Sequence, residues 1–226
     1  MHRFLNRTDA GRDLAETLDA FRGRPDVLVL ALPRGGVPVA FEVAESLGAP
    51  LDVFTVRKLG APMNEEYAIG AIATGGVVAI DEGAVKALAV GGRELEVLIA
   101  RECRELARRE RLYRGDRPLP TVAGRTVIVI DDGLATGSTM QAAVAALRGF
   151  GPARIVVAAP VGSRQACAAI RRVADGCVCC ITPDPLYGVG QWYDDFTQVS
   201  DAEVLELLQR ATRRAAPRAG AALSTA

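Results

Sequence analysis

The sequence predicts an α/β fold built around a parallel sheet. Short apolar runs alternate with amphipathic stretches along the 226 residues, which is typical of repeated strand and helix units. Aromatic residues make up only 5% of the chain, whereas Gly and Ala are abundant, which favours this class over a β-sandwich or a β-barrel. No internal stretch has the composition of an interdomain linker, so we expect a single domain over residues 1–211.

The first part of the chain is predicted to hold three strands and one helix. Apolar runs indicate strands at 27–32, 51–56 and 77–81, and the helical spacing of apolar residues indicates a helix over 37–47. Residues 57–76 are polar and Gly-rich, so we expect a long loop there. Long loops in compact domains are usually functional or mobile.

The second part of the chain repeats the alternation of helix and strand. The predicted elements are a helix from about 93 to 114, strands at 126–132, 154–160 and 177–182, and helices over 139–149 and from Ser163 onward. Such a succession implies a parallel sheet with right-handed crossovers. Ser200 and Glu203 form a capping box for a last helix to about 211. Residues 212–226 are rich in Ala and Arg without periodicity, so we expect a disordered tail.

The charge balance limits the classes of partner. Basic and acidic residues number 27 each, so no global field would recruit nucleic acid or a membrane surface. The first residues lack the apolar core of a signal peptide, and no later apolar run reaches the roughly 18 residues of a membrane span. We therefore expect a cytoplasmic protein whose partners are small molecules.

The five cysteines cluster late in the chain. They are Cys103, Cys167, Cys177, Cys179 and Cys180. In a reducing compartment they are expected to be buried thiols. A metal site formed by the last three is the alternative, but their spacing divides them between two faces of a strand, and the single histidine is His2. We therefore do not expect structural zinc.

The segment 127–139, with the sequence VIVIDDGLATGST, carries the strongest functional signal. In open parallel sheets, ligands bind at the carboxyl ends of strands. There, Asp131 and Asp132 can accept hydrogen bonds from two vicinal hydroxyls, and the small residues 135–139 can present backbone N–H groups to a phosphate at a helix N-terminus. Taken separately, DDG could be a turn and TGST an N-cap. Taken together, they describe a site for a ribose 5-phosphate.

This segment resembles the motif with which type I phosphoribosyltransferases bind 5-phosphoribosyl pyrophosphate (PRPP). In the same order along the chain, LPRGG at 32–36 resembles the family's pyrophosphate loop, and VRK at 56–58 resembles the basic pair before its flexible catalytic loop. The chain is similar over about 1–210 to phosphoribosyltransferase-like proteins of bacteria, in the segments FLNRTDAGRDLA, ALPRGGVPVA, RKLGAP and WYDDF. The resemblance implies a Rossmann-like sheet of about five parallel strands flanked by helices, with a small hood formed by about 1–12 and 182–199.

The resemblance also implies roles for individual residues. Asp131 and Asp132 would bind the ribose hydroxyls, directly or through water on a Mg²⁺ ion held with PRPP. The 5-phosphate loop would comprise Gly133, Ala135, Thr136, Gly137, Ser138 and Thr139. The pyrophosphate would be held by Arg34, Gly35, Gly36, Arg57 and Lys58.

The acceptor is expected to be a nucleobase or another amine. Trp192 and Tyr193 could stack on a planar base, or could only pack the hood onto the domain. Family members that use 6-oxopurines carry an acid where this chain has Ala135, so hypoxanthine, guanine and xanthine are expected to be poor acceptors. In the adenine-using branch a carboxylate of the flexible loop is implicated, and Glu65 and Glu66 lie in the equivalent segment. The alternative for those two residues is a solvated acidic turn.

These features predict a Mg²⁺-dependent pentosyltransferase of nucleotide metabolism that transfers the phosphoribosyl group of PRPP to a nitrogen acceptor and releases pyrophosphate. One alternative is a regulatory protein of the same fold that binds PRPP or a nucleotide with little or no catalysis. A hydrolase or phosphorylase that handles phosphoribosyl compounds would use the same contacts. The expected partners are PRPP and a small nitrogenous acceptor, not nucleic acid or a membrane, and a homodimer is left open.

Overall fold

Five strands form a central sheet in which every neighbouring pair is parallel. The computed structural model describes residues 3–215, without the side chains of residues 65, 66 and 215. In spatial order the strands of this sheet are β2 (Leu51–Val53), β1 (Val27–Ala31), β6 (Thr126–Ile130), β7 (Arg154–Val161) and β8 (Gly176–Ile181). The predicted α/β class with a five-stranded parallel sheet is confirmed.

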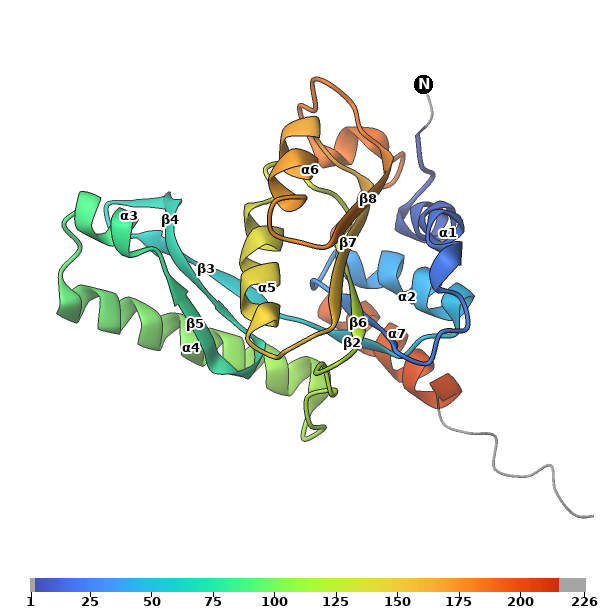
Figure 1. The fold of residues 1–226 in the computed structure, drawn as a ribbon, viewed down its shortest axis with the longest axis horizontal. Helices are drawn as coiled ribbons and strands as arrows, with labels where there is room; N and C mark the ends of the chain where they lie inside the picture. Colours follow the sequence, from blue (N-terminus) through green and yellow to red (C-terminus); the bar gives the residue numbers. More distant parts are fainter. Residues whose placement is uncertain (1–2, 216–226) are drawn as a thin grey trace, which may run out of the picture.

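Helices cover both faces of the central sheet (Figure 1). On one face lie α1 (Arg7–Thr17), α2 (Gly36–Leu47) and α7 (Asp201–Ala215), and on the other lie α5 (Ser138–Arg148) and α6 (Arg164–Ile170). The side chains of β6 alternate between the two layers: Ile128 and Ile130 pack in the cluster with α2, and Val127 and Val129 pack in the cluster with α5. Because both faces are covered, the strands β1 and β6 are buried along their whole length and are almost entirely apolar.

A second, antiparallel sheet projects from the central one (Figure 1). It consists of β3 (Val56–Ala61), β4 (Asn64–Ala73) and β5 (Val77–Ile80), and it is completed by the helices α3 (Glu82–Ala87) and α4 (Gly92–Arg114). We call these five elements the arm. The arm has a hydrophobic cluster of its own, in which Leu59, Ile69 and Ile72 pack against Leu98 and Leu106 of α4.

The prediction of a long loop over 57–76 is wrong, because these residues form β3, β4 and the turn before β5. The glycines that suggested a loop have another role. A Cβ on Gly70 would lie 2.5 Å from the carbonyl oxygen of Ala79, so glycine allows the backbones of β4 and β5 to approach closely. The feature of the sequence that indicated strands was its apolar residues, since Leu59, Ile69 and Ile72 are fully buried in the structure.

Helix α7 extends beyond its predicted end at residue 211. The Oγ atom of Ser200 accepts a hydrogen bond from the backbone N–H of Glu203 at 3.1 Å, as the capping box predicts. The helix then continues to residue 215, so the predicted disordered tail does not begin at 212. Arg214 forms an ion pair with Glu45 of α2, and this contact holds the last turn against the domain. The rest of that tail, 216–226, lies outside the described residues.

The two segments predicted to form a hood lie against each other. Phe4 and Tyr193 form an isolated β-bridge, and the backbone N–H of Phe4 donates to the carbonyl of Trp192 at 2.9 Å. Together with Ala10 these aromatic residues pack on Val161, the last residue of β7. Both segments are therefore held at the carboxyl end of the sheet.

The longest helix is α4, with 23 residues, and it carries many charges. No helix of the part described is long and apolar enough to span a bilayer.

Candidate functional site

Loops that follow neighbouring strands meet at one edge of the central sheet. Because β1, β6 and β7 are parallel neighbours, their carboxyl ends lie together. The backbone N–H of Leu32, after β1, donates to the carbonyl of Ile130 at 2.8 Å. The backbone N–H of Leu134, in the loop after β6, donates to the carbonyl of Val161 at 2.8 Å. These bonds place the predicted pyrophosphate and phosphate loops side by side.

Asp131 and Asp132 are the first two residues after β6. Both side chains are partly buried, and Oδ1 of Asp131 accepts from the backbone N–H of Asp132 at 2.9 Å. Burial, and next the charge of Asp132, raise the pKa of Asp131 well above the ordinary 3.8. Burial also raises the pKa of Asp132, although the nearby guanidinium of Arg7 opposes this effect. The pair therefore concentrates negative charge that hydroxyl donors or a cation would stabilise.

Arg7 of α1 is a site residue that the sequence analysis missed. Its Nε and Nη2 atoms each lie 2.8 Å from Oδ2 of Asp132. Its Nη1 atom donates to the carbonyl of Thr197 at 2.8 Å, and the guanidinium lies 3.9 Å from the ring centroid of Phe196. The two side chains of the ion pair are only 10% and 17% exposed. Arg7 thus fixes one oxygen of Asp132 and leaves the other for a ligand.

Gly35 and Gly36 bring the pyrophosphate loop into direct contact with the acidic pair. A Cβ on Gly35 would lie 2.0 Å from Oδ2 of Asp132, and a Cβ on Gly36 would lie 2.6 Å from the carbonyl oxygen of Ile130. No larger residue fits at either position unless the end of β6 moves. This close approach is the structural reason for the glycine pair.

Arg34 stands at the same edge, after a cis peptide bond that joins it to Pro33. Its Nη1 atom lies 3.9 Å from Oδ1 of Asp201, at the start of α7, and 35% of its side chain is exposed. The same Asp201 oxygen accepts a hydrogen bond from the hydroxyl of Tyr113 at 2.6 Å. Burial, and then this bond, raise the pKa of Tyr113 to about 12, so the hydroxyl remains a donor. Arg34 is therefore oriented by Asp201 while it remains accessible to an anion.

The loop before α5 contains the predicted phosphate ligands Ala135, Thr136, Gly137, Ser138 and Thr139. Gly137 adopts a left-handed conformation with φ of 75°, which turns the chain into the helix. The Oγ1 atom of Thr136 lies 2.9 Å from Oγ of Ser138, so the two hydroxyls are adjacent. The Oγ atom of Ser163 donates a hydrogen bond to the carbonyl of Ala135 at 2.7 Å. The N–H groups of the first turn of a helix have no intrahelical partner, so those that follow this loop are available to an anion.

Comparison with known proteins identifies the family of the chain. The phosphoribosyl transferase domain family matches residues 3–194. Two Mycobacterium tuberculosis proteins, provisionally named phosphoribosyl transferases, are 44% identical over 213 residues, or 94% of this chain. The chain belongs to the phosphoribosyl transferase family. It spans about half the length of these curated relatives, since the match covers 48% of each.

A solved relative shares the architecture of this chain. The crystal structure of TT1426 from Thermus thermophilus is 41% identical in sequence and has a TM-score of 0.83. The match covers 92% of this chain and 98% of that chain. The arm is thus part of an architecture that the two proteins share.

The basic pair Arg57 and Lys58 is divided between the two faces of β3. The Nε atom of Arg57 donates to Glu102 of α4 at 2.7 Å, on the face where Leu59 also packs. Side chains alternate along a strand, so Lys58 shares the opposite face with Val56, which packs in the cluster of α5. Lys58 is exposed. Lys58 therefore lies on the side of the phosphate-loop helix, whereas Arg57 is held against α4.

Glu65 and Glu66 lie on β4, just after the turn of the β3–β4 hairpin. The structure therefore places them on a strand of the arm and not in a flexible loop. At about 3.3 Å per residue, they are roughly 15 Å along the hairpin from its base at the central sheet. Their side chains are outside those described, so their role in proton transfer remains a prediction.

Trp192 and Tyr193 are buried in the hood, which favours the packing alternative over stacking on a base. The ring of Tyr193 lies between those of Phe4 and Phe196, at centroid distances of 5.5 and 4.9 Å. Its hydroxyl donates to the backbone carbonyl of Asp132 at 2.6 Å. Tyr193 thus supports the acidic pair from behind.

Gly133 provides a further contact between the hood and the site. A Cβ at this position would lie 2.3 Å from Cγ1 of Val189 in the hood segment. The role of Gly133 that the structure shows is therefore to let the hood approach the loop after β6.

Two cavities lie away from this edge. Cavities of about 330 and 540 Å³ flank α7, one beside α2 and the other beside α4. The candidate site is instead a surface formed by loops, in which Ala135 and Thr136 are exposed.

Proposed function

We propose that this phosphoribosyl transferase transfers the 5-phosphoribosyl group of PRPP to a nitrogen acceptor and releases pyrophosphate. The observation that carries the proposal is the succession, after β6, of a partly buried acidic pair and an anion-binding loop. Asp131 and Asp132 supply acceptors for two ribose hydroxyls. Residues 135–139 supply N–H and O–H donors for a monophosphate.

The pyrophosphate is proposed to lie against the neighbouring loop after β1. In the reaction, the bond from the anomeric carbon to pyrophosphate breaks, the bond from the acceptor nitrogen forms, and that nitrogen loses a proton. Negative charge therefore grows on the leaving group. Arg34, held by Asp201, and Lys58, on the α5 side of β3, are the cations proposed to stabilise that charge. Arg57 is assigned a positioning role, because it pairs with Glu102.

We propose that Mg²⁺ enters the site with PRPP. The donor set fits this ion, since Mg²⁺ prefers carboxylate oxygens and retains several waters. The raised pKa of Asp131 supports the fit, because it reflects a buried carboxylate pair that a single arginine compensates only in part. Asp131 and Asp132 would hold the ion through PRPP and water. When bound, the ion supplies positive charge to the diphosphate, while Arg7 and Tyr193 keep Asp132 oriented.

The acceptor is proposed to be an amino-bearing base or another amine. Ala135 stands where the 6-oxopurine enzymes carry an acid, and an alanine cannot exchange a proton with the attacking nitrogen. Glu65 and Glu66, on β4, are proposed to accept that proton. The buried Trp192 and Tyr193 are proposed to shape the hood and not to stack on the acceptor.

The proposal is tested by measuring PRPP binding and pyrophosphate release with a panel of acceptors. Calorimetry should show binding that requires Mg²⁺ and that is lost in Asp131→Asn combined with Asp132→Asn. The matched control is Asp19→Asn combined with Asp116→Asn, two exposed aspartates of the same chain, which should bind PRPP like the parent. Unchanged PRPP affinity in the first double variant would refute the assignment of the site. PRPP binding without pyrophosphate release for any acceptor would instead favour the regulatory alternative.

A further inference from the structure

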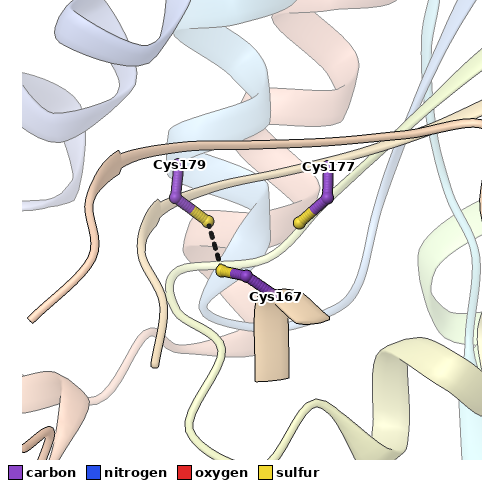
Figure 2. A group of neighbouring side chains, drawn as sticks. All are labelled: Cys167, Cys177 and Cys179. Atoms are coloured by element: carbon purple, nitrogen blue, oxygen red, sulfur yellow. Dashed lines mark hydrogen bonds between the residues drawn. The ribbon is translucent and has the colours of Figure 1, made fainter. Parts of the chain in front are cut away.

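Three thiols converge at the edge of the central sheet (Figure 2). Cys167 comes from α6, and Cys177 and Cys179 come from β8. Their three Sγ atoms lie within 4.8 Å of one another, and those of Cys167 and Cys179 are 3.5 Å apart. Figure 2 shows the three sulfur atoms pointing toward a common centre.

The fold explains why these three thiols meet and why the sequence did not show it. Side chains alternate along β8, so Cys177 and Cys179 share the face toward α6, while Cys180 packs on the opposite face with the α1 and α2 layer. The third thiol comes from Cys167, on a different element. The expectation that spacing divides the last three cysteines between two faces of the strand is therefore confirmed, and Cys167 is the thiol that it did not consider.

Gly162, directly after β7, makes room for two of the sulfur atoms. A Cβ at this position would lie 2.9 Å from Sγ of Cys167 and 2.9 Å from Sγ of Cys179. Any side chain there would push the thiols apart. The glycine backbone thus forms one wall of the thiol cluster.

We propose that Cys167, Cys177 and Cys179 bind one thiophilic d¹⁰ cation, with Cu(I) in three-coordinate thiolate geometry as the best match. Metal–sulfur bonds of about 2.3 Å place three thiolates roughly 4 Å apart around such an ion. The Sγ atoms of Cys167 and Cys179 are 3.5 Å apart and no pair is more than 4.8 Å apart, which is compatible with that value. Among the described residues, no histidine or carboxylate completes the group. Structural zinc usually takes four protein ligands, whereas soft thiolates select Cu(I).

Binding of a cation by this cluster exchanges the protons of the thiols for the metal ion. Each thiol that becomes a ligand releases its proton to solvent, and no electron is transferred. Cys177 and Cys179 are partly exposed, so an ion can reach them from outside.

The thiol cluster adjoins the phosphate loop through a single turn. Gly162 is bridged to Leu134, and Ser163 donates to the carbonyls of Leu134 and Ala135 at 2.9 and 2.7 Å. An ion bound between the thiols would restrain Gly162 and Ser163 on the side of the turn opposite the phosphate loop. If the proposed function holds, ion occupancy would therefore change the affinity for the 5-phosphate.

The test is a titration of the reduced full chain with Cu(I), without oxygen, in competition with a chromophoric Cu(I) chelator. We expect one ion per chain, with X-ray absorption showing three sulfur ligands. Cys167→Ser, Cys177→Ser and Cys179→Ser should each weaken binding more than about 100-fold, because even loss of an outer-shell partner typically costs 10–100-fold. Cys103→Ser and Cys180→Ser are the matched controls and should bind Cu(I) like the parent. Retained binding in Cys167→Ser, or equal loss in the controls, would overturn the proposal.

A second measurement uses the parent protein alone and so does not depend on whether the variants fold. Bound Cu(I) should protect the partly exposed Cys177 and Cys179, but not Cys103, from alkylation mapped by mass spectrometry. Equal protection of all three would contradict the site. Ribose 5-phosphate affinity with and without Cu(I) reports the coupling separately. Absence of ribose 5-phosphate binding in both states would count against the proposed function and not against the ion site, since Cu(I) stoichiometry is read independently.

Discussion

The carboxylates of Asp131 and Asp132 are both partly buried. The guanidinium of Arg7 is paired with the carboxylate of Asp132. Burial raises the pKa of Asp131 well above 3.8, so the folded protein binds this proton more tightly than the unfolded chain does. The contribution of Asp131 to stability is therefore fully present below pH 3.8 and is lost as the pH rises through the raised pKa. The residue best placed to bind ribose is one that weakens the ligand-free fold at neutral pH.

The first prediction follows from this destabilising effect of the ionised Asp131 carboxylate. Asp131→Asn should raise the free energy of unfolding at neutral pH and abolish PRPP binding, because it removes a buried charge while nearly preserving shape. Urea denaturation at neutral and mildly acidic pH measures the effect, and the gain should shrink as the pH falls.

The matched control is Asp26, whose ionised carboxylate stabilises the fold instead of weakening it. The hydrogen bond from Arg24 lowers the pKa of Asp26 to about 2, so Asp26 stabilises the fold above pH 3.8 and loses this effect as the pH falls toward 2. Asp26→Asn should therefore lower stability at neutral pH. A loss of stability in Asp131→Asn as well would show that the raised pKa has been misassigned.

Arg7 gives the second prediction at this scale. Arg7→Met should destabilise the fold by about 3 kcal/mol, because it leaves Asp132 without its partner in a shielded position. The pKa of Asp132 should also rise further, so that PRPP binding fails at a higher pH than in the parent. Arg7→Lys should restore part of both effects. The pH profile of binding separates this positioning role from a purely structural one.

Arg12 is the control, since it lies in the same helix and pairs with Glu42 while 68% of its side chain is exposed. Arg12→Met should change stability by less than about 1 kcal/mol and leave the pH profile unchanged. Equal effects of the two substitutions would contradict a specific role for Arg7.

The residues that could be predicted from the sequence are those whose signal is local. Asp131, Asp132 and the loop to Thr139 follow one another along the chain, and the pattern of strand, acids and small residues is visible there. Arg7 could not be found in this way, because 125 positions separate it from Asp132. The stacking proposed for Tyr193 depended on exposure, which only the packing of the hood determines.

At the scale of elements, the turn from β1 into α2 gives a steric prediction. Gly35→Ala should abolish PRPP binding and destabilise the fold by about 1–3 kcal/mol, the usual effect of overpacking, because the new Cβ would overlap Oδ2 of Asp132. Calorimetry and thermal unfolding measure the two effects. The control is Gly92→Ala at the start of α4, where no atom lies within 4 Å of the new Cβ. That change should leave PRPP binding intact, so a similar loss in both variants would argue against the close approach.

Elements were predicted well where apolar content and periodicity agreed, as in the strands β1, β6 and β7. In the arm, β5 and α4 were predicted, whereas β3 and β4 were interpreted as a loop because polar residues and glycines interrupt their apolar residues. Gly70 shows why composition misleads here, since a glycine in a strand can mark close backbone approach as readily as a loop. The thiol cluster was missed for a related reason: it joins a helix to a strand, and only the packing of α6 on β8 brings them together.

At the scale of the whole molecule, the proposed site is shared between two bodies with separate hydrophobic clusters. The central sheet carries Asp131, Arg34 and the phosphate loop, while the arm carries Glu65 and Glu66. We therefore expect binding of PRPP and proton transfer to be separable by mutation.

This division gives the acceptor prediction. Hypoxanthine, guanine and xanthine should be poor acceptors, and Glu65→Gln or Glu66→Gln should lower kcat by about 10²–10⁴ with an amine acceptor, while PRPP affinity is kept. Glu82→Gln, an exposed acid of the same arm, should leave kcat unchanged. Efficient use of hypoxanthine, or full activity when Glu65 and Glu66 are both replaced, would show that the proton is handled elsewhere.

The contacts of Arg7 and Tyr193 with Asp132 also bear on how the protein is made. Arg7 precedes every strand of the central sheet along the chain and Tyr193 follows them all, yet both must reach the end of β6 before Asp132 is held. A nascent chain that has completed the sheet therefore still lacks its finished candidate site. Ligand affinity should consequently report whether both of these segments have docked, and it should appear later in synthesis than resistance of the sheet to proteases.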